Sequence, residues 1–186
     1  MFYYLFFCKW GDKIISDRDK VTYGEVAGHY GNNSILFGIR YVKNWFLEQV
    51  ASICPVPSWR VRFHKMRGVN IGENVYVGYD VLFDRIHPDL ITIEDYVEIS
   101  DKCILSAHSR GSLTTRDAYP RTVAPIIIRR GAAINPGCII TQGVEIGENS
   151  IIGVGSVVTR NISQNSLALG YPARVVKKLD TEKETK

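Results

Sequence analysis

An aliphatic residue recurs at every sixth position over a long stretch of the chain. The clearest series is Ile128, Ile134, Ile140, Ile146, Ile152 and Val158. Four residues after each of the first five stands a small or β-branched residue: Ala132, Cys138, Val144, Ser150 and Ser156. A helix repeats every 3.6 residues and a strand every two, so a period of six fits neither. The pattern predicts an all-β solenoid of very short strands, in which equivalent residues stack into one core.

The same phase occurs earlier in the chain and is interrupted twice. It comprises two earlier series: Ile71, Val77 and Phe83, then Ile93, Ile99 and Leu105. Phe83 and Ile93 are ten residues apart, which predicts a four-residue insertion around Arg85–Asp89. Leu105 and Ile128 are 23 residues apart, which predicts one long loop excursion over about residues 106–125. An ordinary β-sandwich is the alternative, but its strands do not keep one six-residue phase over six consecutive positions.

The first part of the chain, residues 1–66, lacks the six-residue period. Apolar residues over Ile35–Ala51 recur at helical spacing and predict an amphipathic helix, which two prolines follow. We expect residues 1–66 to form a partly helical cap over the strand edges at one end of the solenoid. Contact of this helix with a membrane surface is the alternative. Residues 180–186 are mostly charged, and we expect a disordered tail.

Composition narrows the class of protein. The chain has 186 residues, 45% of them hydrophobic and 23% charged, which suits one globular domain with a modest accessory segment. The net charge of +4 is mild, and no basic block with interleaved aromatics supports binding of nucleic acid. No run of apolar residues reaches the length of a membrane span. The four cysteines lack CxxC spacing, which indicates free thiols and a cytoplasmic location.

Three runs of sequence resemble a known family. They are IGENV (Ile71–Val75), IGENSIIGVGSVVT (Ile146–Thr159) and GYPAR (Gly170–Arg174). They are similar to the hexapeptide-repeat acyltransferases, and among these most to the maltose, galactoside and exopolysaccharide O-acetyltransferases. The resemblance covers about residues 66–179. It implies a left-handed parallel β-helix over residues 67–179, a homotrimer, and acetyl-CoA as the acyl donor.

Transfer of an acetyl group to a hydroxyl requires a base, because the hydroxyl is a poor nucleophile until its proton is removed. Histidine suits that role, and the chain has only four: His29, His64, His87 and His108. His108 stands where the coil opens into the excursion, and in the resembled family a histidine at this point is the catalytic base. We expect His29 and His64 to be solvated, and His87 to be a surface turn residue.

Asp84 follows Phe83 at the start of the insertion. It stands near the position where the resembled family carries a polar residue that contacts the acceptor, although that residue is often asparagine. The Asp84 carboxylate could hydrogen-bond a sugar hydroxyl or orient the His108 ring. A solvated turn aspartate is the alternative.

The resemblance also implies residues that contact acetyl-CoA. They are Val154 and Gly155 along the pantetheine arm, the pair Thr159 and Arg160, and the phosphate-contacting Arg174 and Lys177. Small residues allow close approach of the backbone, and arginine suits phosphate. Ordinary surface charge is the alternative for the three cations. The chain departs from the galactoside branch at Ala133, where that branch has an aromatic residue, and at Tyr171, where the usual run is Gly-Asn-Pro.

The expected function is an O-acetyltransferase that acts on a sugar or polysaccharide precursor by direct transfer, without an acyl-enzyme and without a metal. Serine, antibiotic or amino-sugar acceptors and a noncatalytic trimeric scaffold are the alternatives. A zinc enzyme of the carbonic anhydrase type, which shares the fold, would need three histidines, two of them closely spaced. His87 and His108 are 21 residues apart and have no third partner in the repeats.

Overall fold

The computed structural model describes residues 34–112 and 114–180. The chain divides into two compact units, Met1–Trp45 and Phe46–Lys186, and the architecture below is that of the second. None of the helices in the described ranges is long and apolar enough to cross a membrane. Residues 1–33 and 181–186 lie outside the described residues, so the capping role of the N-terminal segment and the disorder of the tail stay predictions.

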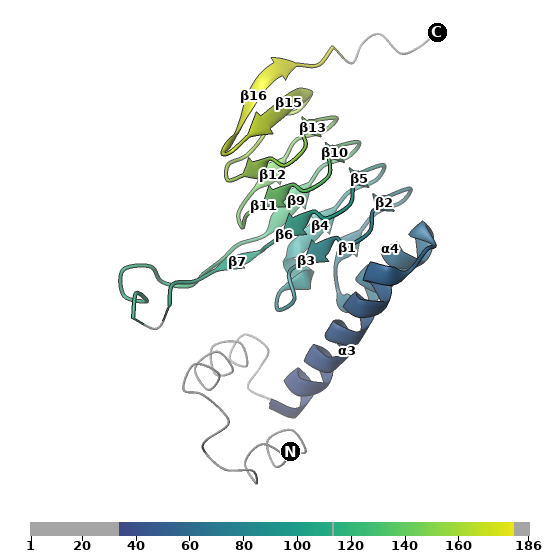
Figure 1. Ribbon diagram of the computed structural model, residues 1–186, viewed down its shortest axis with the longest axis vertical. Coiled ribbons are helices and arrows are strands. Elements are labelled where there is room, and N and C mark those ends of the chain that lie inside the picture. Colours follow the sequence, from purple (N-terminus) through teal and green to yellow (C-terminus); the bar gives the residue numbers. More distant parts are fainter. Residues whose placement is uncertain (1–33, 113, 181–186) are drawn as a thin grey trace. The chain divides into compact units, whose positions relative to one another are not determined.

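Short parallel strands form three sheets, which the chain visits in rotation (Figure 1). The first sheet contains β1 (Asn70–Ile71), β4 (Ile91–Ile93), β9 (Ile126–Ile128) and β12 (Glu145–Ile146). The second contains β2 (Tyr76–Val77), β5 (Glu98–Ile99), β10 (Ala133–Ile134), β13 (Ile151–Ile152), β15 (Ser166–Gly170) and β16 (Ala173–Lys178). The third contains β3 (Leu82–Phe83), β6 (Ile104–Leu105), β11 (Ile139–Ile140) and β14 (Val157–Val158). Each turn of the chain therefore adds one strand to every sheet and builds a three-sided coil.

Equivalent residues stack on one another along the coil. In the second sheet, Ile134 lies in register with Ile99 on one side and Ile152 on the other. These three side chains are at most 1% exposed, and burying each stabilises the fold by roughly 1.5–3 kcal/mol. Their small partners at the neighbouring inward positions are also buried: Ala132, Cys138, Val144, Ser150 and Ser156. The predicted six-residue phase of inward residues is confirmed.

The tight turns between strands place residues in the left-handed backbone region. Gly137 and Gly143 have φ values of 72° and 73°, as expected for turn glycines. Tyr96 and Lys102 occupy equivalent positions with φ values of 59° and 60°. A residue with a Cβ atom pays about 1–2 kcal/mol for this conformation, so packing of the coil holds these two turns in place.

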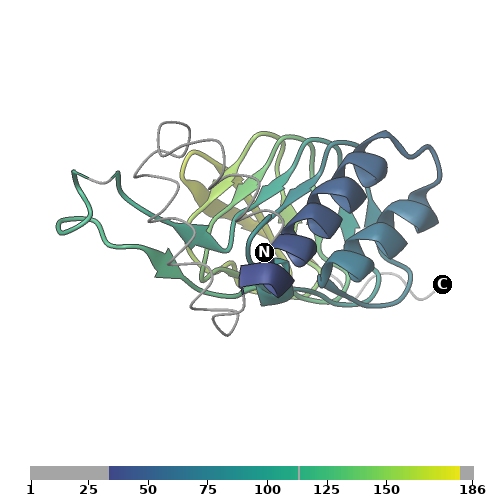
Figure 2. The ribbon, with the colours of Figure 1, turned by 90° about the horizontal axis from the view of Figure 1, so that it is seen from below.

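Both predicted interruptions of the coil occur. After β3 the chain forms a loop and the short 3₁₀ helix η1 (Pro88–Leu90) before it enters β4. After β6 it forms the long excursion, which leaves through β7 (His108–Ser109) and returns through β8 (Thr122–Val123). These two strands pair antiparallel, and Figure 2 shows the excursion projecting away from the coil. The antiparallel pair brings both ends of the excursion back to one place.

Two helices precede the coil. The predicted helix over Ile35–Ala51 is confirmed as α3 (Ser34–Ile53). A second helix, α4 (Pro57–Arg67), was not predicted, because Pro55 and Pro57 were interpreted only as the end of the first helix. Proline is well tolerated in the first turn of a helix, where its missing N–H has no partner to lose. Gly68 ends α4 in the left-handed region with a φ of 109°.

Helix α4 contacts the first strands of the coil through buried polar side chains. The Arg67 guanidinium donates to Glu48 Oε2 at 3.2 Å and to the Phe83 carbonyl at 3.3 Å. It also lies 3.1 Å from Nδ1 of His64. The expectation of a solvated His64 is wrong, since this residue is 3% exposed. Burial, together with the charges of Arg67 and Arg60, lowers the pKa of His64 to about 3, so the ring is neutral.

The C-terminal end of the described coil reverses direction. β16 pairs antiparallel with β15, with Gly170 opposite Ala173 at the turn. All other pairs in the three sheets are parallel. β16 therefore covers the outer edge of β15 in the second sheet.

Candidate active site

The two interruptions leave the coil at the same corner. β3 and β6 are neighbours in the third sheet, with Phe83 in register with Leu105. The insertion begins just after Phe83 and the excursion just after Leu105, so the two segments emerge one above the other. We call the residues that directly follow β3, β6 and β11, together with β8 and the adjacent Arg121, the His108 corner. The fold thus brings together polar residues that are far apart in the sequence.

Asp84 is the centre of this corner and is buried, with no exposed side-chain surface. Its Oδ1 accepts hydrogen bonds from the backbone N–H of Ile86 and of His87, both at 2.9 Å. Its Oδ2 accepts from the backbone N–H of Ala107 at 2.8 Å and lies 2.6 Å from Nδ1 of His108. The expectation that Asp84 orients the His108 ring agrees with this contact. The alternative of a solvated turn aspartate is wrong.

The hydrogen bonds decide the charge of Asp84. Burial is the largest influence and on its own raises the pKa of the carboxyl group. The hydrogen bonds from His108 and from the backbone of His87 and Ile86, with the charge of His108, outweigh burial and lower the pKa below its usual value. Asp84 is therefore an anion at neutral pH and can only accept hydrogen bonds.

This anion determines which nitrogen of His108 carries the proton. Because the carboxylate only accepts, Nδ1 of His108 must donate, and Nε2 of the neutral ring is left as a proton acceptor. The His108 side chain is 25% exposed, so the ring is accessible at the surface of the coil. Ser106 Oγ donates to the His108 carbonyl at 2.9 Å and holds its backbone. The arrangement is that of a general base with an orienting carboxylate.

His87 lies beside His108, and its ring is fully buried. The two ring centroids are 5.8 Å apart, in an edge-to-face arrangement. The expectation of a surface turn residue is wrong, because the excursion packs over the insertion. From the excursion, the Arg121 guanidinium contacts Nε2 of His87. A guanidinium only donates, so Nε2 of His87 accepts and its proton lies on Nδ1.

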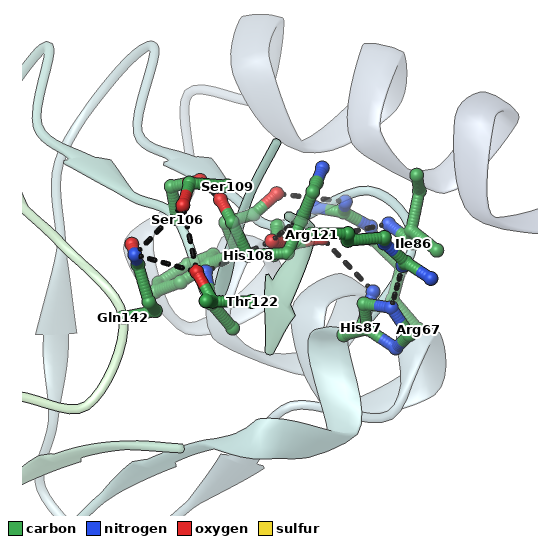
Figure 3. A network of polar contacts seen from close by, with 12 residues as sticks. Arg67, Ile86, His87, Ser106, His108, Ser109, Arg121, Thr122 and Gln142 are labelled. Carbon is green, nitrogen blue, oxygen red and sulfur yellow. Dashed lines mark hydrogen bonds and ion pairs between the residues drawn. The ribbon is translucent and has the colours of Figure 1, made fainter. Parts of the chain in front are cut away.

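A cluster of hydroxyl and amide groups forms the base of the excursion (Figure 3). Ser109 Oγ lies 2.8 Å from Thr122 Oγ1, and the two belong to the paired strands β7 and β8. The Gln142 amide, which follows β11, donates to both at 2.9 Å and 3.2 Å. Tyr119 OH is 3.4 Å from Ser109 Oγ. Ser109 follows His108 directly in the sequence, and the pairing of β7 with β8 brings Thr122 to the same place.

The six residues expected to contact acetyl-CoA lie nearer the C-terminal end of the coil. Val154 and Gly155 form the turn between β13 and β14, while Arg174 and Lys177 belong to β16, and Thr159 and Arg160 follow β14. β14 stacks on β11, which stacks on β6, so Thr159 and Arg160 lie in the same column as the His108 corner, two turns further along. Within the described residues, no hydrogen bond or ion pair joins any of the six to His108.

Two of these positions have the properties that a cofactor arm and a phosphate require. A Cβ atom placed on Gly155 would meet nothing within 4 Å, so the backbone there is open to a ligand. Val154 beside it is 73% exposed. Arg174 is exposed, and within the described residues its guanidinium donates only to the neighbouring carbonyl of Ala173, at 2.8 Å. A ligand phosphate could take up the remaining donors of this guanidinium.

The sequence reasoning missed four residues of the corner: Arg121, Ser109, Thr122 and Gln142. A signal for them was present. The two breaks in the six-residue phase follow Phe83 and Leu105, which are equivalent positions one turn apart. Stacking alone therefore places the insertion against the excursion. Which side chains meet there still depends on how the excursion folds, and the period gives no information on that.

A groove of about 670 Å³ lies at another corner of the coil, lined by charged residues of both signs that include Lys65, Glu94, Asp95 and Arg130. None of the described residues that line it is a histidine, a cysteine or a serine. In the described part of the chain, no group of three or more His, Cys, Asp or Glu residues is arranged to hold a metal ion. The chemistry that the sequence predicts therefore has its geometric support at the His108 corner.

Comparison with known proteins gives similar sequences over part of the chain. No family model matches. The galactoside O-acetyltransferase of Escherichia coli (strain K12) is 30% identical over 128 residues, which are 64% of this chain and 59% of the relative. The chain spans less than two thirds of the length of the first curated relatives that it matches.

Solved structures agree on the fold. A hexapeptide-repeat acetyltransferase of Vibrio cholerae matches with a TM-score of 0.66 over 77% of this chain and 93% of that one, at 21% identity. A galactoside acetyltransferase in complex with coenzyme A matches with a TM-score of 0.57 over 77% of this chain and 82% of that one, at 25% identity. The resemblance to this family that the sequence motifs indicate is confirmed.

Proposed function

We propose that this chain, which resembles the hexapeptide-repeat acetyltransferases in sequence and in fold, transfers an acetyl group from acetyl-CoA to a hydroxyl group. The observation that carries the proposal is the contact between His108 Nδ1 and the buried Asp84 carboxylate at 2.6 Å. It fixes the ring with Nε2 as a proton acceptor at the surface of the coil. His108 is the general base, and Asp84 is the residue that positions it.

The reaction is a direct transfer. The acceptor hydroxyl attacks the thioester carbonyl carbon while His108 Nε2 takes the hydroxyl proton. The tetrahedral intermediate collapses, the carbon–sulfur bond breaks, and the departing CoA sulfur receives the proton from His108. Asp84 stabilises the imidazolium that forms between these steps. Backbone N–H groups stabilise the negative oxygen of the intermediate.

Direct transfer is favoured over an acyl-enzyme. Cys54, Cys103 and Cys138 are free thiols, but all three are buried in the described structure. A nucleophilic cysteine must instead be accessible and hold a thiolate. Ser109 is close to His108 in sequence, but its hydroxyl hydrogen-bonds Thr122 and Gln142 rather than a base. No second covalent step is therefore required.

The donor site consists of Val154 and Gly155 along the pantetheine arm, Thr159 and Arg160, and Arg174 and Lys177 at the phosphates. Support comes from the open backbone at Gly155, the exposed cation at Arg174, and the coenzyme A present in the similar galactoside acetyltransferase. No metal takes part in the proposed chemistry. Acetyl-CoA supplies the activated acyl group, and the six residues bind and orient it.

The protein acts as a homotrimer of left-handed coils, with the donor bound between neighbouring coils. The outward residues of the third sheet support an interface between copies, because all four are aliphatic: Leu82, Ile104, Ile139 and Val157. The outward residues of the first sheet include Asn70, Thr92 and Glu145, which suit water. A sheet face with only aliphatic side chains is stabilised when association removes it from water.

We place the trimer in the cytoplasm. Contact of its N-terminal segment with the inner membrane face would bring it close to a polysaccharide precursor.

The acceptor is a sugar or polysaccharide precursor. The hydroxyl and amide groups of Ser109, Thr122 and Gln142 beside His108 support this class, since they can exchange hydrogen bonds with sugar hydroxyls. A galactoside O-acetyltransferase among the similar sequences points the same way. Serine, antibiotic and amino-sugar acceptors belong in the test.

The test measures release of CoA thiol from acetyl-CoA with a panel of sugars, sugar nucleotides, serine and antibiotics. We expect turnover with at least one sugar-based acceptor, unaffected by a metal chelator. His108→Ala should lower kcat by about 10²–10⁴-fold, because general base catalysis contributes that much. CoA should still raise the thermal unfolding temperature of the variant. Near-normal turnover of His108→Ala contradicts the assignment, and a protein that CoA does not stabilise is a scaffold instead.

A further inference from the structure

Arg121 is a cation at the His108 corner with no assigned role. It stands at the end of the excursion, next to Thr122 of β8, and its guanidinium contacts Nε2 of the buried His87. His87 in turn is anchored to the corner, because its backbone N–H donates to Asp84. Figure 3 shows Arg121, His87 and His108 in one cluster. The guanidinium is therefore held beside the catalytic ring by a rigid support.

The charge of Arg121 is not neutralised by this support. The contact to His87 requires an uncharged nitrogen lone pair, so the ring contributes no negative charge. Within residues 34–112 and 114–180, no carboxylate forms an ion pair with Arg121. Asp84, the carboxylate at the centre of the corner, is fully engaged by three backbone N–H groups and His108. A positive charge thus remains available at the mouth of the site.

Two other arginines near this corner are used differently. Arg67 and Arg85 both pair with Glu48, at 3.2 Å and 2.9 Å. Their charges serve the packing of the helices on the coil. Arg121 is half-buried and uses one nitrogen on His87, which leaves the rest of the donor fork without a hydrogen bond in the described structure. A planar fork of this kind suits a carboxylate or a phosphate.

We infer that Arg121 binds an anionic group of the acceptor, a carboxylate or a phosphate, and so selects negatively charged sugars. The inference rests on the proposed function and names the substrate class of the same site. The hydroxyl groups of Ser109 and Thr122 contact the sugar ring, His108 removes the proton of the reacting hydroxyl, and Arg121 holds the charged group. Arg121 does not bind the phosphates of CoA in this arrangement, because the extended pantetheine arm separates them from the thioester at His108.

The experiment compares matched acceptors that differ only in charge. The panel contains a neutral methyl hexoside, the corresponding methyl hexuronoside with a carboxylate, and the corresponding hexose phosphate. CoA release is measured with wild type, Arg121→Gln, Arg121→Lys and Arg116→Gln. The last variant removes the same charge from another arginine of the excursion and is the control.

We expect wild type to prefer the carboxylate or the phosphate over the neutral sugar by about tenfold or more in kcat/KM. Arg121→Gln should reduce kcat/KM for that anionic acceptor by about 10–100-fold, mostly through KM, since charge-assisted hydrogen bonds are of this strength. Arg121→Lys should recover part of the loss. In Arg121→Gln, turnover of the neutral acceptor and the KM for acetyl-CoA should change by less than about threefold. In the Arg116→Gln control, kcat/KM for the anionic acceptor should also change by less than about threefold. The anionic acceptor that wild type prefers shows whether Arg121 binds a carboxylate or a phosphate.

Two outcomes overturn the inference while the proposed function stands. One is wild-type turnover of neutral and anionic acceptors with equal kcat/KM. The other is an Arg121→Gln variant that loses neutral and anionic turnover equally, or whose KM for acetyl-CoA rises instead, which would assign Arg121 to support of the loop or to the donor. Failure of the proposed function is distinct, since no acceptor of any charge would then be acetylated and CoA would not stabilise the protein.

Discussion

Asp84 accepts four hydrogen bonds through two oxygens, two from the insertion and two from the start of the excursion. The backbone donors at Ile86 and His87 shape the insertion, and the donor at Ala107 fixes the start of the excursion. The fourth donor is His108 itself. A single side chain therefore sets both the loop geometry and the tautomer of the His108 ring. Its negative charge is as important as its shape, because all four partners donate.

We expect Asp84→Asn to lower kcat by about 100-fold or more, while the KM for acetyl-CoA changes little. An amide has one donor end, so either Nδ1 of His108 loses its acceptor or buried backbone N–H groups do. Each buried N–H without a partner costs about 1–3 kcal/mol, so the free energy of unfolding should fall as well. Steady-state kinetics and urea unfolding measure the two effects.

Asp80→Asn is the control for this substitution. Asp80 is an exposed turn residue at a φ of 54°, a conformation that asparagine adopts readily. That variant should match wild type in kcat and in stability. Equal loss of activity in both variants would show that removal of any negative charge on this side of the coil is enough to lower kcat. That result would refute the positioning role of Asp84.

The sequence predicted the surroundings of single residues less well than it predicted the elements of the fold. His108 could be singled out because it follows Leu105 at the break in the period, and that is a property of the sequence alone. His64 and His87 were expected in water and are buried instead. Their burial depends on Arg67 and Arg121, and the second of these is 34 residues from its partner. No local pattern marks such a contact.

At the scale of elements, helix α4 shows why composition misleads. Its sequence contains four cations, Arg60, Arg62, Lys65 and Arg67, which is typical of a solvated segment. Two of them are buried, because Glu48 and backbone carbonyls accept from their guanidinium groups. Arginine at such a position is a hydrogen-bond donor to strand ends rather than a surface charge. The strands from β1 to β6 and from β9 to β14 were predictable, since the six-residue period places an inward apolar residue in each.

The contact between α4 and the coil should make stability depend on pH. The neutral ring of His64 has a pKa of about 3 in the fold, whereas the unfolded chain takes up a proton near 6.5. Between these values the unfolded state binds more protons, so the free energy of unfolding falls as the pH falls. This group contributes a slope of about 1.4 kcal/mol per pH unit below pH 6. His64→Gln should lack that slope while it keeps an acceptor for Arg67.

Urea unfolding at several values between pH 4.5 and 7 measures the slope. Asp84 does not change the measured slope in this range. Its pKa is lowered in the fold, so its contribution to the free energy of unfolding is lost only below about pH 4. His108→Ala, measured in parallel, should keep the slope that His64 causes. Identical pH dependence in wild type and His64→Gln would show that His64 is not held neutral by the fold.

At the scale of the whole molecule, the repeating coil was predictable and the assembly is a further prediction. The third sheet turns Leu82, Ile104, Ile139 and Val157 outward, one per turn of the coil. Burial of such a stripe in a symmetric trimer removes it from water and closes the interface on itself. The six-residue period identifies the residues that point into the core. The outward residues between them indicate which sheet forms the interface with another copy of the chain.

Ile139→Glu should therefore convert a trimer into monomers and reduce acetyl-CoA turnover, because it places a charge in the middle of the interface. Sedimentation velocity measures the first effect. Ile151→Glu is the matched control, since Ile151 holds the equivalent outward position in the second sheet. A wild-type monomer, or a trimer that tolerates Ile139→Glu and is broken by Ile151→Glu, would refute the assignment of the third sheet as the interface.

The antiparallel pairing of β7 with β8 has a consequence for how such a chain can change over time. His108 lies opposite Val123, so the excursion starts and finishes at one point, and the coil resumes its rotation whatever the length between them. A segment of different length and composition could replace the one between Ser109 and Thr122 while every turn above and below kept its partners. The scaffold and the proposed donor site would be inherited intact. The proposed preference for an acceptor would then change through replacement of the excursion alone.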